Sequence, residues 1–561
     1  MTKKLLILIF TLILTVGSVG CSKVEPQASS DDTTSNNTET EFVYDKDDEM
    51  SSKDSQSSSS YDLTLSKKDL NDSYDETEAG TITFSGSNVT VSGDGLSVSG
   101  STVTIKSEGT YILSGNGNGQ VVVSLEDEDG KVQLVLNNLT LSNSNGAAIL
   151  VTDADKVIIT VPESTESTIS DGTSYSETVD STEVDATIFS KEDLTINGKG
   201  TLNVNGNYAH GIVSKDDLVV YETTVNVEAV KTALRGKDSV VLVDCSINAK
   251  AGTKGLESDN DEDDGKGYIY VENSSVTVVS GTKGILAENY IYLLSGTVKV
   301  TSSDDAIHCN NTIQIDNASL TLSSGDDGIH ADNVIVINGG DIKITKSYEG
   351  IEAEVITVNG GNIDITSSDD GFNAGGNSST TDSYQYHNAM MDTDSNAVLT
   401  INDGYIHVNA QGDGLDSNGY LYIKGGTVYV CGPSGSGNGS LDWGISGSIT
   451  GGTLIALGSS GMNEKISSVT QGTIIADISQ QSASALVEIV DSNGKTILSY
   501  TSEKTFSNVT VSSSLIEKGS TYSINVNGKT VTTITMSDLQ YYNASGMGQG
   551  MGNSQPGGFR R

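Results

Sequence analysis

Asp326-Asp327-Gly328-Ile329 is one of five short segments between Ser303 and Ser417 in which an acidic residue stands two places before an apolar one. The other four are Asp304-Asp305-Ala306-Ile307, Tyr348-Glu349-Gly350-Ile351, Asp369-Asp370-Gly371-Phe372 and Gly412-Asp413-Gly414-Leu415. The first three steps between the apolar residues are 22, 22 and 21 residues long. A fixed period of this size accommodates three short strands with their turns and indicates a solenoid. We therefore predict an all-β fold, a right-handed parallel β-helix of about 22 residues per coil.

The segment from Gly328 to Glu349 supports this prediction, because it contains three apolar pairs separated by turns. In each pair the two residues are spaced by two positions, as in a strand whose alternate side chains face a core. The pairs are Ile329/Ala331, Ile335/Ile337 and Ile342/Ile344. Turn residues such as Asn338-Gly339-Gly340 separate them. The same columns recur in the neighbouring coils, so we expect one continuous apolar core.

The acidic residues of the five segments form a column of their own. Equivalent positions in a parallel stack lie about 4.8 Å apart, so carboxylates in this column would repel one another and raise one another's pKa unless a cation lies between them. Oxygen ligands from neighbouring coils suit Ca²⁺. We predict Ca²⁺ as the cofactor, held by Asp304, Asp305, Asp326, Asp327, Glu349, Glu352, Asp369, Asp370, Asp413 and Asp416. The alternative is that each Asp-Gly pair only shapes a turn.

The composition narrows the possible partners. The chain has 561 residues, with 31 Lys and Arg against 74 Asp and Glu, which gives a formal net charge of −43. This charge argues against binding to nucleic acid or to anionic headgroups. It favours divalent cations or neutral glycans.

The N-terminus has the pattern of an export signal. Met1-Thr2-Lys3-Lys4 precedes an apolar run that ends near Cys21, and this run is short for a membrane span. We predict a signal peptide over 1–20, lipidation of Cys21 and a disordered tether over 21–75, because that segment has almost no apolar clusters. A bacterial lipobox usually has a large aliphatic residue where this chain has Ser18, so cleavage and secretion without a lipid is the alternative.

The rest of the chain divides by its pattern into three parts. Residues 76–478 are predicted to form the β-helix, 479–542 a small antiparallel β unit and 543–561 a disordered Gly/Met-rich tail. The apolar marker of the coil recurs from Ile149 to Leu415, and the last coil is assigned to Ile445. The step from Phe372 to Leu415 holds one coil plus a long loop, roughly Gly375 to Asn396.

Tyrosines provide a second candidate for ligand binding. The predicted sugar-contacting tyrosines are Tyr268, Tyr270, Tyr290, Tyr292, Tyr420 and Tyr422 on outward strand positions, with Tyr384 and Tyr386 in the long loop. Aromatic rings on a flat sheet can lie against the apolar faces of sugar rings. Ordinary stacking of rings between coils is the alternative.

One stretch of the sequence resembles a known protein family. The run Gly115 to Gly172, with Val132-Gln133-Leu134-Val135-Leu136 and Gly146-Ala147-Ala148-Ile149, resembles a family of bacterial surface carbohydrate-binding β-helix proteins. The resemblance implies binding of acidic plant polysaccharide such as polygalacturonate, and of cellulose. It also implies a fold similar to that of family 9 polysaccharide lyases, which hold Ca²⁺ with an Asp-Asp-x-x-Asp cluster. Asp369-Asp370-Gly371-Phe372-Asn373 and Asp413-Gly414-Leu415-Asp416 come nearest to that cluster.

Three functions are compatible with these patterns. We expect a calcium-dependent polysaccharide-binding lipoprotein of the bacterial surface that does not cleave its ligand and touches the membrane only through its lipid. The first alternative, a pectate lyase-like enzyme, needs a base beside Ca²⁺, and Lys343 and Lys346 have neither a desolvating pocket nor an arginine partner in the sequence. The second alternative is a structural adhesin. His308 and His330 are interpreted as outward surface groups, and Cys245, Cys309 and Cys431 as free thiols.

Overall fold

The computed structural model describes residues 65–375 and 393–544. Every regular element in these two ranges is a strand, so the all-β prediction is confirmed for them. Within the same ranges there is no helix long and apolar enough to cross a membrane. Cys21 and the predicted signal peptide lie outside the described residues, as do Tyr384, Tyr386 and the C-terminal tail from residue 545.

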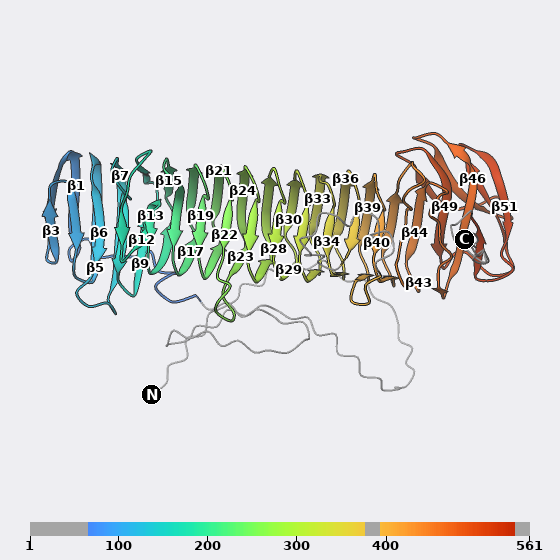
Figure 1. Ribbon diagram of the computed structural model, residues 1–561, viewed down its shortest axis with the longest axis horizontal. Coiled ribbons are helices and arrows are strands. Elements are labelled where there is room, and N and C mark those ends of the chain that lie inside the picture. The colour runs from blue at the N-terminus through green and yellow to red at the C-terminus, as the bar shows by residue number, and fades with distance from the viewer. Residues whose placement is uncertain (1–64, 376–392, 545–561) are drawn as a thin grey trace, which may run out of the picture. The chain divides into compact units, whose positions relative to one another are not determined.

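Three strands make up each coil in the middle of the chain. Two successive coils consist of β28 (Ile307–Cys309), β29 (Thr312–Ile315) and β30 (Ser319–Ser323), followed by β31 (Ile329–Ala331), β32 (Val334–Ile337) and β33 (Asp341–Lys346). Each strand pairs in parallel with its equivalent in the next coil, so that Ile307 lies beside Ile329 and Ile313 beside Ile335. The strands are stacked side by side in Figure 1, and the parallel pairing of equivalent strands repeats through the coils between the two ends. The predicted parallel pairing is thus confirmed.

The apolar pairs of each coil face inward, as predicted. Ile329, Ile335 and Ile342 are each at most 1% exposed, and so are their partners two residues on. The first strands of the coils form a single 14-stranded sheet in which the markers from Ile149 to Leu415 lie in register. Cys245, Cys309 and Cys431 are buried and free, which confirms that prediction for the described residues.

The assignment of the last apolar marker to Ile445 is wrong. Leu441 forms a parallel bridge with Leu415 and is 6% exposed, whereas Ile445 is 42% exposed. Ile445 comes immediately before β43 (Ser446–Ile449), beyond the bridge, and so points out of the core. The coil is therefore shorter than the distance to Ile445 suggests.

The long step from Phe372 to Leu415 contains one coil with an insertion. β37 (Phe372–Ala374) pairs with β40 (Leu415–Ser417), and β38 (Val398–Ile401) pairs back to β35 (Val355–Val358). Residues 376–392, within the predicted loop, lie outside the described residues.

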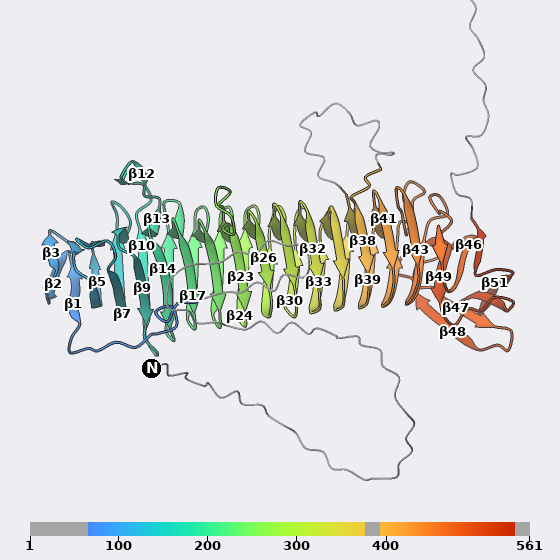
Figure 2. The same ribbon diagram turned by 90° about the horizontal axis from the view of Figure 1, so that it is seen from below.

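The two ends of the coiled region pair differently from its middle. At the N-terminal end, β1 (Gly80–Gly86) is antiparallel to β2 (Asn88–Ser92). At the C-terminal end, four strands form a separate antiparallel sheet: β47 (Leu486–Asp491), β48 (Thr496–Thr501), β50 (Thr521–Val526) and β51 (Lys529–Thr535). β49 (Phe506–Ser513) links this region to the coils by pairing antiparallel with β44 (Thr453–Gly458). This arrangement corresponds to the small antiparallel unit expected there (Figure 2).

Residues 65–75 differ from the prediction of a tether, because they dock on the sheet. The Asp69 side chain is buried, and its Oδ1 lies 3.0 Å from the Nζ of Lys156. Asn197 donates a hydrogen bond to the Asp69 carbonyl, and Asp69 Oδ1 also accepts one from Thr195. Disorder was predicted here because the segment is polar. Composition does not reveal that one of its carboxylates, that of Asp69, enters a buried hydrogen-bond network.

Replacing Lys156 by Met should lower the free energy of unfolding by about 3 kcal/mol, because it leaves the Asp69 carboxylate buried without its cation. Denaturant unfolding of the purified variant measures this loss. Adding Asp69→Asn should restore part of it, since the uncompensated charge is then removed. A double variant as unstable as Lys156→Met alone would contradict this explanation.

Candidate functional site

The acidic column lies in the turns that lead into the first strand of each coil, and it bonds the coils to one another. Asp305 Oδ1 accepts a hydrogen bond from the backbone N–H of Asp327 at 3.1 Å, and Asp327 Oδ1 accepts one from that of Glu349 at 3.1 Å. Asp370 Oδ1 accepts one from Asp413 at 2.6 Å. One oxygen of each of these three carboxylates, Asp305, Asp327 and Asp370, therefore has a structural role, as in the turn-shaping alternative, and the second oxygen can contact another partner.

Three of the predicted calcium ligands converge at the C-terminal part of the column. Asp370 precedes β37, Asp413 precedes β40 and Asp416 lies on β40, and one oxygen from each lies within 4.8 Å of the others. Asp413 also accepts a hydrogen bond from the backbone of Gly439. Asp442, which the sequence prediction missed, adds a fourth negative charge that acts on the same group.

This acidic cluster is electrostatically unfavourable by itself. Burial, with the neighbouring Asp369 charge, raises the pKa of Asp370 to about 7. Burial and the Asp370 charge raise the pKa of Asp413 to about 9. The pKa of Asp416 is raised well above its usual value by burial and by Asp370 and Asp442. A divalent cation among these oxygens would offset both the burial and the repulsion.

Asn373 supplies an independent indication of a ligand beside this cluster. It lies on β37 in register with Asp416, and its Nδ2 donates to Glu349 Oε2 at 2.8 Å. Its Oδ1 is buried and has no hydrogen-bond partner among the described residues. An amide oxygen without a donor beside several carboxylates matches the oxygen ligands that Ca²⁺ prefers. The residues present therefore fit the predicted ion.

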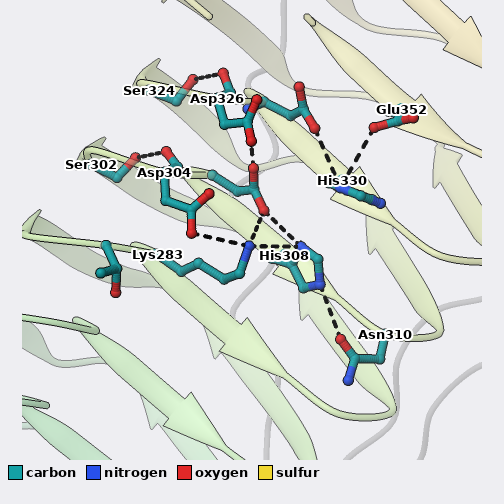
Figure 3. Close-up of polar contacts among 12 residues, drawn as sticks. Lys283, Ser302, Asp304, His308, Asn310, Ser324, Asp326, His330 and Glu352 are labelled. Atoms are coloured by element: carbon teal, nitrogen blue, oxygen red, sulfur yellow. Dashed lines mark hydrogen bonds and ion pairs between the residues drawn. The ribbon is translucent and has the colours of Figure 1, made fainter. Parts of the chain in front are cut away.

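The N-terminal part of the column already contains a positive charge. Asp304, Asp305 and Asp326 come within 4.8 Å of one another, but Lys283 forms ion pairs with Asp304 at 3.4 Å and with Asp305. Burial raises the pKa of Asp305, but hydrogen bonds from His308 and Lys283 outweigh it and hold that pKa below its usual value. Figure 3 shows Lys283 extended towards Asp304 and His308.

Between these two parts lie Asp327, Glu349 and Glu352. Burial and the charge of Glu352 raise the pKa of Glu349, and burial and Asp327 raise that of Glu352. Two of the predicted ligands, Glu349 and Asp369, belong to none of the convergent groups of described residues. The sequence prediction also missed His308 and His330 as members of the column. Their positions three residues after Asp305 and Asp327 were a usable signal.

Three of the six predicted tyrosines that the structure describes are buried. Tyr268, Tyr270 and Tyr292 are at most 5% exposed, so the prediction of open rings is wrong for these three. Tyr268 lies in register with Tyr290 and Tyr270 with Tyr292, and rings at the spacing of neighbouring strands cover one another. Alternation in a strand identifies which way a side chain points but not what covers it.

Three other predicted tyrosines remain partly accessible. Tyr290, Tyr420 and Tyr422 are half-buried, and Tyr420 and Tyr422 stack with ring centroids 5.8 Å apart. Both rings belong to one strand, β41 (Tyr420–Ile423), so this contact lies within a coil and is not the stacking between coils given as the alternative. The two rings are still partly open to a ligand.

A further aromatic group was missed by the sequence prediction. Tyr405 is 49% exposed and its ring centroid lies 5.7 Å from that of Tyr429, which stacks on Tyr500 at 5.0 Å. His407 Nε2 lies 3.1 Å from the Tyr500 hydroxyl. Tyr500 comes from the antiparallel sheet, outside the repeat, so no periodicity could have placed it here.

Comparison with known proteins identifies the family. The family model of carbohydrate-binding domain-containing proteins matches residues 99–371 and 282–439, which together run over more than half of the chain. The chain belongs to this family, which confirms the resemblance to carbohydrate-binding proteins.

One curated relative and one solved structure are also similar to parts of this chain. A carbohydrate-binding domain-containing protein of Acetivibrio thermocellus is 33% identical over 129 residues, or 23% of this chain, and the match spans about 45% of that relative's length. A polysaccharide lyase-like protein from C. thermocellum, determined as a gadolinium derivative, is 29% identical, with a TM-score of 0.38 over 46% of this chain and 96% of its own.

Proposed function

We propose that this protein is a calcium-dependent carbohydrate-binding protein that holds plant cell-wall polysaccharide, polygalacturonate or cellulose, without cleaving it. The observation that carries the proposal is the convergence of Asp370, Asp413 and Asp416 beside the unpartnered oxygen of Asn373. Membership of a carbohydrate-binding family supports a carbohydrate as the ligand. The site offers only oxygen donors, which supports Ca²⁺ as the ion.

The net charge explains why an ion would be needed for an acidic ligand. A chain with a formal charge of −43 repels a polyuronate. Ca²⁺, when bound, would supply positive charge that a sugar carboxylate can share. Asp370, Asp413, Asp416 and Asn373 would hold it from the protein side, and because Ca²⁺ takes six to eight oxygens, positions remain for the ligand.

The winding of the coils is a further part of the proposal. We infer that the described coils wind as one right-handed parallel β-helix. The parallel registers between equivalent strands support this, and connections between parallel strands are right-handed in nearly all proteins. We propose the boundaries 76–478 for the β-helix and 479–542 for the β cap, while the tether over 21–75 has to end before residue 65, because residues 65–75 dock on the sheet.

The lysines near the acidic column favour binding over cleavage. A lyase base has to be neutral at working pH. Burial lowers the pKa of Lys283, but the hydrogen bond and charge of Asp305 outweigh it and raise that pKa above its usual value. Lys343 is paired with Asp364 at 3.1 Å. Both amines are therefore suited to ion pairs rather than to proton abstraction.

Incubation with polygalacturonate and Ca²⁺ should leave the ultraviolet absorbance unchanged, because lyase action alone creates an unsaturated product. Binding should be measured in parallel by sedimentation with insoluble polygalacturonate and with cellulose, each with Ca²⁺ or with chelator. A steady rise in absorbance that is absent in the Lys283→Ala variant would contradict the binding proposal and support a lyase instead. Equal sedimentation with and without Ca²⁺ would show that binding of the polysaccharide does not depend on the ion.

We also propose that Cys21 carries a lipid that attaches the protein to the bacterial surface. The motivation is the short apolar run that ends at this cysteine. Cys21→Ala should move the protein from the membrane fraction to the medium, as measured by immunoblotting of both fractions. Unchanged membrane association would show that another element anchors the chain.

A further inference from the structure

A cavity of about 330 Å³ opens on the acidic column between Lys283 and Glu352. His308 on β28 and His330 on β31 both line it, and their ring centroids are 4.6 Å apart because they lie in register on successive coils. Figure 3 shows both imidazoles on the same side of the strands as Lys283 and Glu352. The Asp370, Asp413 and Asp416 cluster lies on later coils and does not line this cavity. Asn373 of the proposed calcium site adjoins it, because its Nδ2 donates to Glu349 Oε2 at 2.8 Å and to Glu352 Oε1 at 3.4 Å.

The two histidines have different surroundings. His308 Nδ1 is 2.8 Å from Asp305 Oδ2, and Lys283 pairs with the same carboxylate, so the Asp305 charge is already compensated. His330 Nδ1 lies 3.3 Å from Asp327 Oδ2 and 3.6 Å from Glu352 Oε2. These two carboxylates therefore share one imidazole nitrogen.

The distances around His330 match the edges of a metal coordination sphere. Ligand atoms at about 2.0 to 2.1 Å from a tetrahedral Zn²⁺ lie about 3.4 Å from one another. The two measured separations, 3.3 and 3.6 Å, fall on either side of that value. One ligand atom from each of Asp327, His330 and Glu352 lies within 4.8 Å of the other two, so the three residues converge on one place.

We propose that Asp327 Oδ2, His330 Nδ1 and Glu352 Oε2 form a second metal site, which takes a first-row transition-metal ion such as Zn²⁺ and is distinct from the calcium site. An imidazole nitrogen suits Zn²⁺ and its neighbours in the series, whereas Ca²⁺ takes oxygen ligands. Three protein ligands leave a fourth position on the cavity side for water or for an oxygen of a bound molecule.

The surrounding structure holds the ligands in place. The Asp327 Oδ1 atom accepts the backbone N–H of Glu349, which fixes this carboxylate and directs Oδ2 towards His330. The Asp327 side chain is 7% exposed, while those of His330 and Glu352 are 25% and 27% exposed. The site is thus anchored on its inner side and open on its outer side, as an ion that enters from solvent requires.

The test is a calorimetric titration of the purified full chain with Zn²⁺ in the presence of saturating Ca²⁺. A parallel titration with Co²⁺ reports the coordination geometry through its visible absorption bands. We expect one equivalent of Zn²⁺ to bind and tetrahedral Co²⁺ bands to appear. His330→Ala should weaken this binding at least tenfold, because one of three ligands is lost. His308→Ala is the matched control and should bind Zn²⁺ like the wild type, because its partner Asp305 is held by Lys283.

The proposal is overturned if the wild type binds no Zn²⁺ at micromolar concentrations, or if His330→Ala binds it unchanged. It is also overturned if His308→Ala removes the binding equally, since the ion would then lie on the Asp305 side. Thermal unfolding of each variant with Ca²⁺ should match that of the wild type, which shows that the variants fold. Failure of the calcium proposal would leave these results unaffected.

Discussion

Replacing Asp413 and Asp416 together by Asn should abolish both the calcium-dependent stabilisation and the binding of polygalacturonate. An ion that binds only the folded protein adds about 2.7 kcal/mol of stability when its free concentration is a hundredfold above its Kd. The double variant should lose this increment, because two of the convergent carboxylates no longer carry charge. Thermal unfolding with Ca²⁺ and with chelator, and sedimentation with the polysaccharide, measure the two losses.

The same variant should be no less stable than the wild type in chelator. Asn keeps an oxygen acceptor for the Gly439 N–H that Asp413 now binds, and unlike Asp it cannot ionise within the buried cluster. Asp244→Asn with Asp403→Asn is the matched control, because both residues are exposed and lie in other turns. If the control loses calcium dependence to the same degree, net charge rather than the site is responsible. A double variant that keeps its calcium response would exclude Asp413 and Asp416 as ligands.

The second large effect concerns pH. In chelator, the free energy of unfolding should fall as pH rises from about 4 towards 9. The pKa values of Asp370 and Asp413 are raised to about 7 and about 9 in the folded protein, whereas an unfolded Asp titrates near 3.9. Above the unfolded pKa the unfolded chain loses these protons first, so the stabilisation present at low pH disappears as pH rises through the folded pKa values. Each unit by which a pKa is raised corresponds to about 1.4 kcal/mol.

Saturating Ca²⁺ should flatten this pH dependence, because it favours the ionised carboxylates in the folded state. Denaturant unfolding at several pH values, with Ca²⁺ and with chelator, measures the difference. Asp413→Asn with Asp416→Asn should flatten the chelator curve as well, which separates the cluster from the general repulsion of an acidic chain. A wild-type curve that rises with pH in chelator would contradict the raised pKa values.

The repeat itself was predictable because each coil buries the same columns. Ile307, Ile329 and Ile351 occupy one inward position in three successive coils, and the structure places them in register. The same spacing predicted that Asp370 and Asp413 would be neighbours. Periodicity is a strong signal where every coil has the same length, and it failed at Leu441, where the last step is shorter than the one assigned.

Contacts made by residues outside the repeat were not predictable. Asp69 reaches Lys156 across 87 residues, and Tyr500 reaches His407 across 93, and neither pair shares a period. Glu352 is different, since it lies one coil beyond His330 and register alone places them side by side. The sequence contained that juxtaposition, although His330 was interpreted as an outward surface group.

The bonding of each carboxylate to the backbone of the next coil also fixes spacing along the protein. Asp305 accepts the backbone N–H of Asp327 in the next coil, and Asp327 accepts that of Glu349 in the coil after it, so each turn is bonded to the turn of its immediate neighbour. Glu352, Asn373 and Asp416 stand in one column on three successive coils, so the first and last are about 10 Å apart. Deleting or duplicating one whole coil between two such residues would change their separation by about 4.8 Å without disturbing either end. Equivalent side chains are therefore separated by whole multiples of the coil spacing, and the proposed polysaccharide ligand would meet them at those intervals.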